Sequence, residues 1–306
     1  MITPYMADGK VDYRGVEALV EWYYKNGCDG IFAVCQSSEI FCLTLEERVK
    51  IAKTVADKAK TLAQADNSRK PMEIVVSGHI SDSFEAQAEE LNAMAGTGAD
   101  AMILITNRMD VANVSDEAWI ADLHKLIEKL SENIPLGLYE CPKPYKRLLT
   151  KKMLRACVDT GRFLFIKDTC CDAATIKERV ELLRGSGVRL YNANAQTLLE
   201  TVRAGADGYC GVMANFHPEV YRWLLDNAEK PCAETVQAFA ATAAFTESLA
   251  YPTTAKYYLK RYENMDILPL SRTADCKLVT EYQKSCLAQM KTLGEYIGKH
   301  FGIAKR

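Results

Sequence analysis

The sequence predicts an α/β protein of the (β/α)8 barrel class, followed by an α-helical extension. Short apolar segments typical of buried parallel strands alternate with amphipathic helical segments. A glycine, a small residue and an aspartate recur between a helix and the next strand. The strand pattern stops near residue 225, and the chain beyond it has helical character only. We therefore expect residues 1–225 to form the barrel domain and residues 226–306 to form a helical extension used in packing or subunit contact.

Strands and helices alternate with recognisable start signals. Asp12 can cap a first helix, and Thr44 with Glu47 three residues later has the spacing of a capping box. In the extension, the longest expected helix covers residues 275–301. The eight expected strands are residues 1–3, 30–34, 73–77, 101–105, 135–139, 163–167, 188–191 and 208–212.

An internal repeat supports the closed barrel. Gly27, Gly98 and Gly205 each end a helix and precede a small residue and an aspartate. Their separations of 71 and 107 residues are close to two and three units of about 36 residues, a plausible length for one β/α unit. An open doubly wound sheet is the alternative, but no Gly-x-Gly-x-x-Gly segment follows the first strand. The repeat therefore favours the barrel.

Composition and charge limit the kinds of molecule that this protein is expected to bind. The formal net charge of the 306 residues is -2, so no strongly basic surface for nucleic acid or an anionic membrane is expected. No apolar run reaches the roughly 18 to 20 residues that span a bilayer, and no signal peptide is evident, which predicts a cytoplasmic protein. The 11 cysteines include no CxxC pair and are expected to be reduced thiols. The four separated histidines give no support for a metal site, and we expect neither metal nor cofactor.

The carboxyl ends of barrel strands normally carry the functional groups. Here they offer one amine, Lys167, and one phenol, Tyr139, without a carboxylate pair. An amine can condense with a ketone to an iminium ion, an electron sink for the adjacent carbon–carbon bond, and a phenol can shuttle the protons. Taken singly, Lys167 also fits a strand end meeting solvent, and Tyr139 fits an aromatic residue on the barrel rim. Together they are the reactive pair that the sequence offers.

Two segments carry a resemblance to a known family. Residues 139–142 (Tyr-Glu-Cys-Pro) are similar to a Tyr-x-x-Pro motif after the fifth strand, and residues 166–169 (Ile-Lys-Asp-Thr) are similar to a lysine segment on the sixth. With these motifs the chain resembles, over nearly its full length, the dihydrodipicolinate synthase and N-acetylneuraminate lyase family of class I, Schiff-base-forming aldolases. The resemblance implies a pyruvate-type 2-keto acid bound as an imine to Lys167, with Tyr139 relaying protons and no cofactor.

The resemblance also implies a substrate-binding loop at residues 35–39. In the family this loop reads Gly-Ser/Thr-Thr-Gly-Glu and holds the substrate carboxylate, whereas here it reads Cys-Gln-Ser-Ser-Glu. Ser37 falls at the second hydroxyl position and is expected to be catalytic, hydrogen-bonding the carboxylate or Tyr139. Gln36 and Ser38 are expected to bind substrate. Both glycines are replaced, so a left-handed backbone at those positions would be strained.

Further departures from the family bear on the outer pocket. Asn192, Asn194 and Cys210 are expected to bind substrate, and the two amides suit hydroxyls of a sugar-like or other polar 2-keto acid. Synthases of the family place an arginine shortly after Tyr-x-x-Pro, where this chain has Pro144. They also use a tyrosine from a neighbouring subunit after the fourth strand, but residues 106–115 contain none.

These observations predict an N-acetylneuraminate lyase-like lyase or aldolase that cleaves or forms a carbon–carbon bond next to a 2-keto acid. One alternative is 4-hydroxy-tetrahydrodipicolinate (dihydrodipicolinate) synthase itself, and another is a sugar-acid dehydratase, in which the same enamine expels hydroxide. A non-catalytic barrel that binds a keto acid is the alternative of a different class. A metal-dependent aldolase is disfavoured by the few histidines. By analogy with the family, the helical extension indicates a homotetramer or homodimer.

Overall fold

Strands and helices alternate along the chain in the computed structural model, which describes residues 1–273 and 278–303. The strands are β1 (Gly30–Ala33), β2 (Glu73–Val76), β3 (Ala101–Ile105), β4 (Leu136–Tyr139), β5 (Phe163–Asp168), β6 (Arg189–Asn192) and β7 (Gly208–Tyr209). The α-helices are α1 (Tyr13–Lys25), α2 (Leu45–Ala65), α3 (Phe84–Ala95), α4 (Asp116–Ile127), α5 (Lys151–Asp159), α6 (Ala173–Leu183), α7 (Leu198–Arg203), α8 (Pro218–Asp226), α9 (Ala233–Ala243), α10 (Thr253–Tyr262) and α11 (Glu281–Phe301). Short 3-10 helices are η1 (Gln36–Ser38), η2 (Ile40–Cys42), η3 (Thr106–Arg108), η4 (Val212–Asn215) and η5 (Ala244–Ser248).

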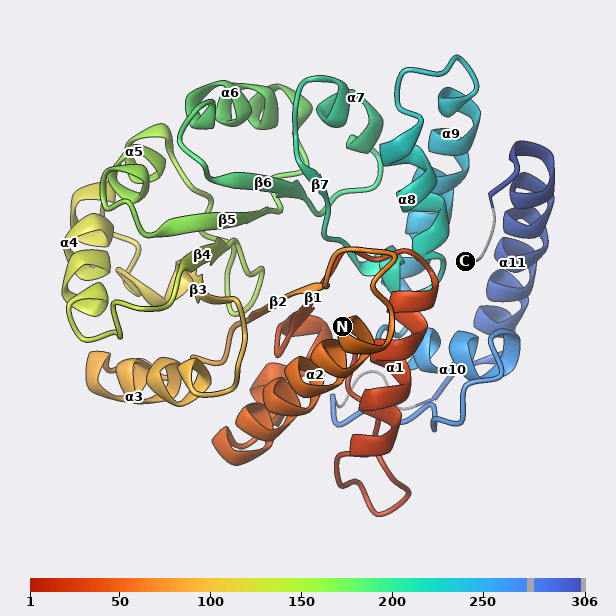
Figure 1. The fold of residues 1–306 in the computed structure, drawn as a ribbon, viewed down its shortest axis with the longest axis horizontal. Helices are drawn as coiled ribbons and strands as arrows, with labels where there is room; N and C mark the ends of the chain where they lie inside the picture. The colour runs from red at the N-terminus through yellow and green to blue at the C-terminus, as the bar shows by residue number, and fades with distance from the viewer. Residues whose placement is uncertain (274–277, 304–306) are drawn as a thin grey trace.

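The strands form one parallel sheet in chain order, so neighbours in sequence are neighbours in the sheet. Figure 1 shows the strands curled, with α3 to α7 in an arc outside them and α8 to α11 grouped on the other side. Parallel strands covered by helices and joined by helical crossovers are the arrangement of a β/α barrel. The predicted barrel with a C-terminal helical extension is confirmed. All carboxyl ends of the strands therefore meet on one side of the molecule.

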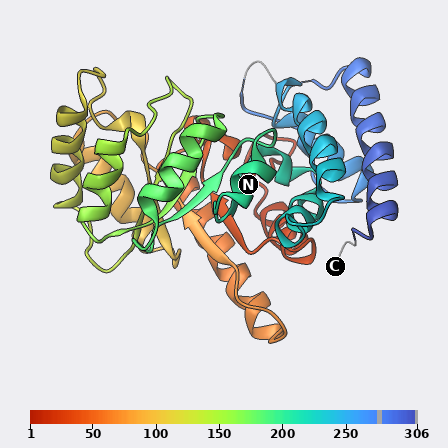
Figure 2. The same cartoon turned by 90° about the horizontal axis from the view of Figure 1, so that it is seen from above.

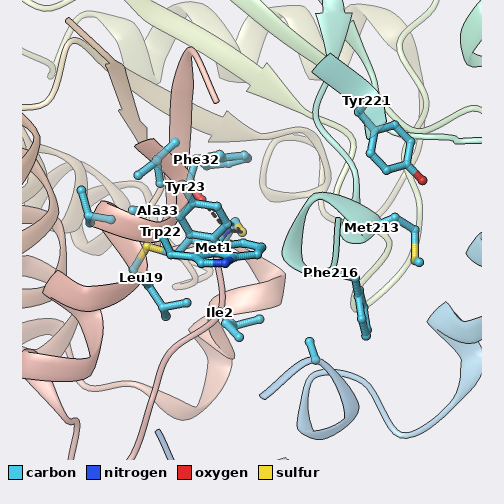
Figure 3. Packing of buried hydrophobic residues seen from close by; sticks show 14 of the residues in the cluster. Met1, Ile2, Leu19, Trp22, Tyr23, Phe32, Ala33, Met213, Phe216 and Tyr221 are labelled. Carbon is cyan, nitrogen blue, oxygen red and sulfur yellow. Dashed lines mark hydrogen bonds between the residues drawn. The ribbon is translucent and has the colours of Figure 1, made fainter. Parts of the chain in front are cut away.

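The first expected strand differs from the prediction. The Met1 ammonium donates to the Phe32 carbonyl of β1 at 2.9 Å, and the Thr3 hydroxyl donates to the Ser38 carbonyl at 2.8 Å. Figure 3 shows Met1 and Ile2 packed beside α1 and β1. No regular ladder forms over residues 1–3, because Pro4 follows and offers no N–H to continue one. The segment lies beside β1 but is not a strand.

Local sequence signals work as expected at the helix starts. The Asp12 carboxylate accepts from the Gly15 N–H at 3.0 Å and caps α1. Thr44 and Glu47 form a capping box at the start of α2, each side chain accepting from the other residue's backbone N–H. Capping of this kind satisfies N–H groups that the first turn leaves without partners. The helices therefore begin where the sequence indicates.

The glycine–aspartate repeat has a structural explanation. Its three glycines adopt left-handed φ angles of 83°, 84° and 106°, which a side chain would disfavour, at Gly27, Gly98 and Gly205. In two copies the aspartate accepts a hydrogen bond from a strand N–H at 2.7 Å. Asp100 accepts from Ile74 of β2, and Asp207 accepts from Leu190 of β6. Each repeat thus ends a helix, and in two of the three the aspartate also ties the next strand to the one before it.

The extension is helical, as expected. Its last helix, α11, begins at Glu281 rather than at residue 275, because Thr280 and Gln283 form a capping box there. Residues 275–277 of the expected helix lie outside the described residues. In Figure 2, α11 forms the edge of the molecule opposite α3 and α4. None of the described helices is both long and apolar enough to cross a membrane. The boundary between a barrel domain and an extension at residue 225 stays a prediction.

Candidate active site

Strands β4 and β5 place Tyr139 and Lys167 side by side. The two residues are register partners at the carboxyl ends of these parallel strands, so their side chains share one face of the sheet. The Lys167 Nζ lies 4.6 Å from the centroid of the Tyr139 ring and 5.4 Å from that of Phe32. Only 8% of Lys167 and 4% of Tyr139 is exposed. We call Tyr139 and Lys167 the strand-end pair, and the structure brings it together as the sequence indicated.

Aromatic rings close the barrel interior beneath the strand-end pair. Phe32 of β1 packs edge-on against Tyr139 and Phe165, and Phe165 stacks on Tyr191 of β6. Among the described residues no carboxylate lies within ion-pair distance of the Lys167 Nζ. This nitrogen instead faces the rings of Phe32 and Tyr139. The amine therefore has a packed floor and no competing acid at its nitrogen.

The next residue on each strand points the other way and anchors the strand ends. Glu140 and Asp168 follow the strand-end pair, and both carboxylates contact the Arg179 guanidinium of α6, Glu140 at 2.9 Å. All three side chains are at most 3% exposed. Glu140 also accepts from the backbone N–H groups of Leu149 and Thr169 at 2.7 and 2.8 Å. Burial raises the pKa of Glu140, and Arg179 opposes that shift. This buried ion network fixes the ends of β4 and β5 relative to each other.

A cavity of about 850 Å³ opens above the strand-end pair. Five of the eight predicted site residues line it, namely Gln36, Ser37, Tyr139, Lys167 and Asn194. The elements that supply this lining are the carboxyl ends of strands and the loops after them, together with η5 and the segment before α10. The cavity is large enough for a small organic acid and a second small molecule.

The other three predicted residues serve different neighbours. The Ser38 hydroxyl donates to the Met1 carbonyl at 2.7 Å. The Asn192 amide donates to two threonine hydroxyls at 2.9 Å, and its carbonyl oxygen accepts from the Asn194 N–H. Burial raises the pKa of the Cys210 thiol, and the charge of nearby Lys167 opposes this. Ser38 and Asn192 thus shape the loops behind the cavity, whereas Cys210 lies close to the amine.

The loop after β1 adopts a conformation that the sequence did not indicate. Residues 36–38 form the 3-10 helix η1, and Cys35 has an extended φ of -113°. The positive φ angles fall instead on Val34 and Glu39, at 53° and 61°. A left-handed backbone at Cys35 or Ser38, the two positions where the family has glycine, would have been strained, but neither residue adopts one, and Val34 does. A β-branched residue is rare in this region and costs about 1–3 kcal/mol, so surrounding contacts must hold the loop.

Of the two partners predicted for Ser37, the substrate carboxylate and Tyr139, the described residues can supply only Tyr139, and Ser37 bonds to another tyrosine instead. Its hydroxyl bonds to the side chain of Tyr251, which precedes α10. The Tyr251 hydroxyl also accepts from the Asn215 amide at 3.0 Å, and Asn215 accepts from the Tyr23 hydroxyl at 2.6 Å. A chain of hydroxyls and one amide therefore connects η1 to α1 and to the extension. Sequence reasoning missed Tyr251 because it lies more than 200 residues from Ser37.

Tyr139 bonds to a thiol rather than to Ser37. Its hydroxyl shares a hydrogen bond with the Cys141 side chain, and the Cys141 thiol donates to the Gln36 Oε1 at 3.4 Å. Burial raises the pKa of Tyr139 well above its ordinary value, and the neighbouring thiols add to this. Tyr139 is therefore protonated at neutral pH. Each cysteine that the structure describes is a free thiol.

Glu39 fastens the loop to the extension. It pairs with Lys256 of α10 at 2.8 Å, and both side chains are 0% exposed. It also accepts from the Ser271 hydroxyl and the Arg272 N–H, each at 2.7 Å. A buried charge needs such partners. The interaction gives the otherwise strained loop a rigid end.

A sequence model described as the dihydrodipicolinate synthetase family matches residues 1–250. The chain belongs to this family. Membership makes it an enzyme of the lyase class, of the class I aldolase type. The two motifs that carried the resemblance end neighbouring strands, and both contribute residues to the lining of the cavity.

Known members of the family support the assignment. The chain is 27% identical to 4-hydroxy-tetrahydrodipicolinate synthase of Clostridium perfringens over 219 residues, covering 72% of this chain and 70% of the relative. It is 25% identical to the synthase of Saccharophagus degradans over 259 residues, covering 82% and 84%. Two solved structures share the fold with a TM-score of 0.80. YagE from E. coli in complex with pyruvate is 20% identical, covering 99% of this chain and 97% of that one. CdNal from Clostridium difficile in complex with mannosamine is 15% identical, covering 94% and 95%.

Charged residues that the sequence did not single out also line the cavity of this family member. Arg108 of η3 and Lys143 and Lys146 of the β4–α5 loop lie on one side, and Glu247 of η5 comes from the extension. Glu247 belongs to an alanine- and threonine-rich segment of the extension, which was expected to serve packing or subunit contact. Its one signal was an acidic residue within an otherwise uncharged stretch. Within residues 1–273 and 278–303, no three His, Cys, Asp or Glu side chains cluster closely enough to hold a metal ion.

Proposed function

We propose that this chain is a Schiff-base-forming lyase that breaks or makes a carbon–carbon bond next to a pyruvate-type 2-keto acid, with Lys167 as the imine-forming residue. The observation that carries the proposal is the strand-end pair. A buried amine without an acid partner lies 4.6 Å from a phenol ring at the base of a cavity. Membership in the family supports the same chemistry. YagE, which shares the fold, was crystallised with pyruvate.

The proposed chemistry assigns separate tasks to the two residues. The Lys167 Nζ adds to the C2 carbonyl carbon with its lone pair. The C2 oxygen leaves as water, with one proton from this nitrogen and one from Tyr139, and a protonated C2=N bond forms. Tyr139 is protonated at neutral pH because burial raises its pKa, so it donates a proton to the departing oxygen. The protonated imine then accepts the electron pair of the C3–C4 bond, which becomes the C2=C3 bond of an enamine. The C4 hydroxyl gives its proton to the Tyr139 phenolate left by the first step, and C4 leaves as an aldehyde. The reverse sequence joins the keto acid to an aldehyde.

For the second half of the substrate we propose a polar, sugar-like aldehyde, as in N-acetylneuraminate lyase. Asn194 offers a neutral amide to the cavity, while Arg108, Lys143 and Lys146 offer positive charge for a carboxylate. The fold neighbour CdNal was crystallised with mannosamine. Amide and guanidinium groups together suit a hydroxylated acid better than an apolar one.

A second candidate is 4-hydroxy-tetrahydrodipicolinate synthase, the name carried by the relatives at 25–27% identity. Arg108 could take the role of the arginine that the family places at the position of Pro144. A sugar-acid dehydratase is compatible with the same Lys167 chemistry. Condensation of pyruvate with aspartate semialdehyde would identify the synthase, and release of water from a sugar acid would identify the dehydratase.

The test is borohydride reduction of the protein in the presence of pyruvate, followed by peptide mass mapping. Reduction turns the imine into a stable secondary amine. We expect one pyruvate-derived adduct on the peptide that contains Lys167, and none in Lys167→Ala. Lys152→Ala is the control, because Lys152 is an exposed lysine of α5 that does not line the cavity and should leave the Lys167 adduct unchanged. An adduct on Lys146, or none with pyruvate and larger 2-keto acids, would refute the proposed chemistry and favour a barrel that only binds a keto acid.

A further inference from the structure

Glu247 stands apart from the other acidic residues of the cavity. Its side chain, on η5, is half-buried and lines the same cavity as Lys167. Glu39, by comparison, is bound by Lys256, Ser271 and Arg272. Among the described residues none forms a hydrogen bond or ion pair with Glu247. A partly desolvated carboxyl without a protein partner is costly, so such a group in a cavity wall indicates contact with a ligand.

The proton path through Tyr139 offers a reason why another acid–base group is needed. The Tyr139 hydroxyl bonds to Cys141, and the thiol donates to the Gln36 carbonyl oxygen. A side-chain amide does not give up or accept protons at neutral pH, so this path ends at Gln36. Ser37, the nearest hydroxyl on the same loop, is bonded to Tyr251 instead. Tyr139 can serve the departing C2 oxygen, but it has no evident route for repeated proton exchange.

Each reaction considered for this cavity includes one common step, a proton transfer at C3. A synthase must remove a C3 proton to form the enamine, a cleaving aldolase must return one, and a dehydratase must remove one before hydroxide leaves. We propose that Glu247 is the catalytic residue that accepts this proton from C3 of the Lys167-bound keto acid and returns it. The proposal rests on the imine chemistry proposed above and holds for all three reactions.

The step balances without any further reactant. The C3–H bond breaks and its proton moves to a Glu247 carboxylate oxygen. The electron pair of that bond forms the C2=C3 double bond. The π electrons of the C2=N bond move to the imine nitrogen as a lone pair, which neutralises its positive charge. In the reverse direction the enamine carbon takes the proton from the Glu247 carboxyl. Between turnovers the carboxyl exchanges its proton with solvent water in the open cavity, so it returns to the protonation state in which it began.

The surroundings of Glu247 suit a group that both takes and gives a proton. Burial raises the pKa of Glu247 to about 7, and the opposing charge is Lys167 of β5. Transfer in both directions is most efficient when the pKa lies near the working pH. The other titratable groups that interact with Glu247 are Cys171 after β5, Tyr209 of β7, Tyr221 of α8 and Tyr251 before α10. Burial raises the pKa of all four, so each stays neutral around pH 7.

The test follows exchange of the pyruvate methyl protons in deuterated water by NMR, with borohydride trapping in parallel. Trapping reports the imine, and methyl exchange reports C3 proton transfer, so neither requires the second substrate. We expect Glu247→Gln to trap pyruvate as the wild type does while its exchange rate falls at least 100-fold. In the wild type, exchange should rise as the pH increases through about 7, and this rise should be absent in Glu247→Gln. Glu247→Asp should retain part of the rate.

Controls separate this inference from the proposed function and from misfolding. Glu229→Gln changes an exposed carboxyl of the extension and should alter neither measurement. An unchanged unfolding midpoint shows that Glu247→Gln is folded. If Glu247→Gln exchanged the methyl protons at the wild-type rate, Glu247 would not be the C3 acid–base residue, and the imine chemistry would stand. If Glu247→Gln no longer trapped pyruvate, Glu247 would be a binding residue instead, and the imine chemistry of the wild type would again stand. A wild type that neither traps nor exchanges pyruvate would overturn both proposals.

Discussion

The two walls of the cavity are held by different means. The strand-end wall consists of β4 and β5 with the strand-end pair, and Arg179 ties it from behind. The loop wall consists of residues 35–39, η5 and Tyr251, and Lys256 and the segment at residues 271–272 fix it from the extension. The first wall joins segments about 30 residues apart, and the second joins segments more than 200 residues apart. The reactive amine lies on the locally assembled wall.

The contrast separates a fixed part of the site from an adjustable one. Parallel strand pairing and a fully buried ion network allow the strand-end pair little freedom. The loop wall depends on hydroxyl and amide contacts at its cavity surface, and each such contact contributes about 1 kcal/mol. A site built in this way can keep its imine chemistry while the residues that contact the rest of the substrate change.

The largest effect is expected from Arg179→Met, which leaves Glu140 and Asp168 buried side by side without their cation. Removing one partner of a buried ion network costs about 3–5 kcal/mol of unfolding free energy. The measurement is urea unfolding at neutral pH. The loss should shrink at acid pH. Burial raises the pKa of Glu140 and Arg179 opposes that shift, so in the variant this carboxyl is protonated more readily and its uncompensated charge is removed.

A matched control for Arg179→Met is Arg184→Met in the same region of the chain. Arg184 pairs with Glu181, but the two side chains are 71% and 69% exposed. Exposed pairs contribute at most about 1 kcal/mol. Equal losses in the two variants would show that the buried network does not hold the strand-end wall.

The contrast also explains what could be predicted from the sequence. The β/α alternation, the helix caps at Asp12 and Thr44 and the partnership of Tyr139 with Lys167 depend on local patterns, and all are visible in the printed chain. The contacts of Ser37 with Tyr251 and of Glu39 with Lys256 are not. They depend on how the extension packs on the barrel, which no periodicity or motif encodes.

The predictions for the first strand, for the strained loop positions and for the segment that contains Glu247 were incomplete for physical reasons of the same kind. Residues 1–3 look like a strand in composition, but regular pairing is cut short before Pro4. A left-handed backbone would have been strained at the two replaced glycines, but the positive φ angles lie at Val34 and Glu39, on either side of Cys35 and the η1 turn. Glu247 was assigned to a packing segment because its place in the cavity wall arises only from the tertiary fold.

A smaller effect is expected from Lys256→Met, which tests the anchor of the loop wall. Glu39 would lose its cation but keep the hydrogen bonds from Ser271 and Arg272. Because these bonds still compensate part of the buried charge, we expect a loss of about 2 kcal/mol in unfolding free energy. Pyruvate should also bind more weakly, since the loop at residues 36–37 loses its fixed end. Urea unfolding and the pyruvate dependence of borohydride trapping measure the two effects.

Lys284→Met provides the comparison for Lys256→Met. Lys284 pairs with Glu281 at the start of α11, where Glu281 is 90% exposed. We expect no measurable change in stability or in pyruvate binding. A loss of stability in Lys256→Met without weaker pyruvate binding would mean that the anchor supports the fold and not the loop.

The smallest effect is expected from Tyr251→Phe, which removes one hydroxyl from the loop wall and keeps the ring. Ser37 loses its partner, and the Asn215 amide loses an acceptor at 3.0 Å. One such contact contributes about 1 kcal/mol to stability. If Ser37 helps to hold the keto-acid carboxylate, the pyruvate concentration needed for half-maximal trapping should rise several-fold, while the maximal trapping rate, set by the strand-end pair, stays the same. Tyr296→Phe, on an exposed residue of α11, is the control.

If Tyr251→Phe lowered the maximal trapping rate, the loop wall would take part in imine formation itself. The division between a fixed and an adjustable wall would then not hold.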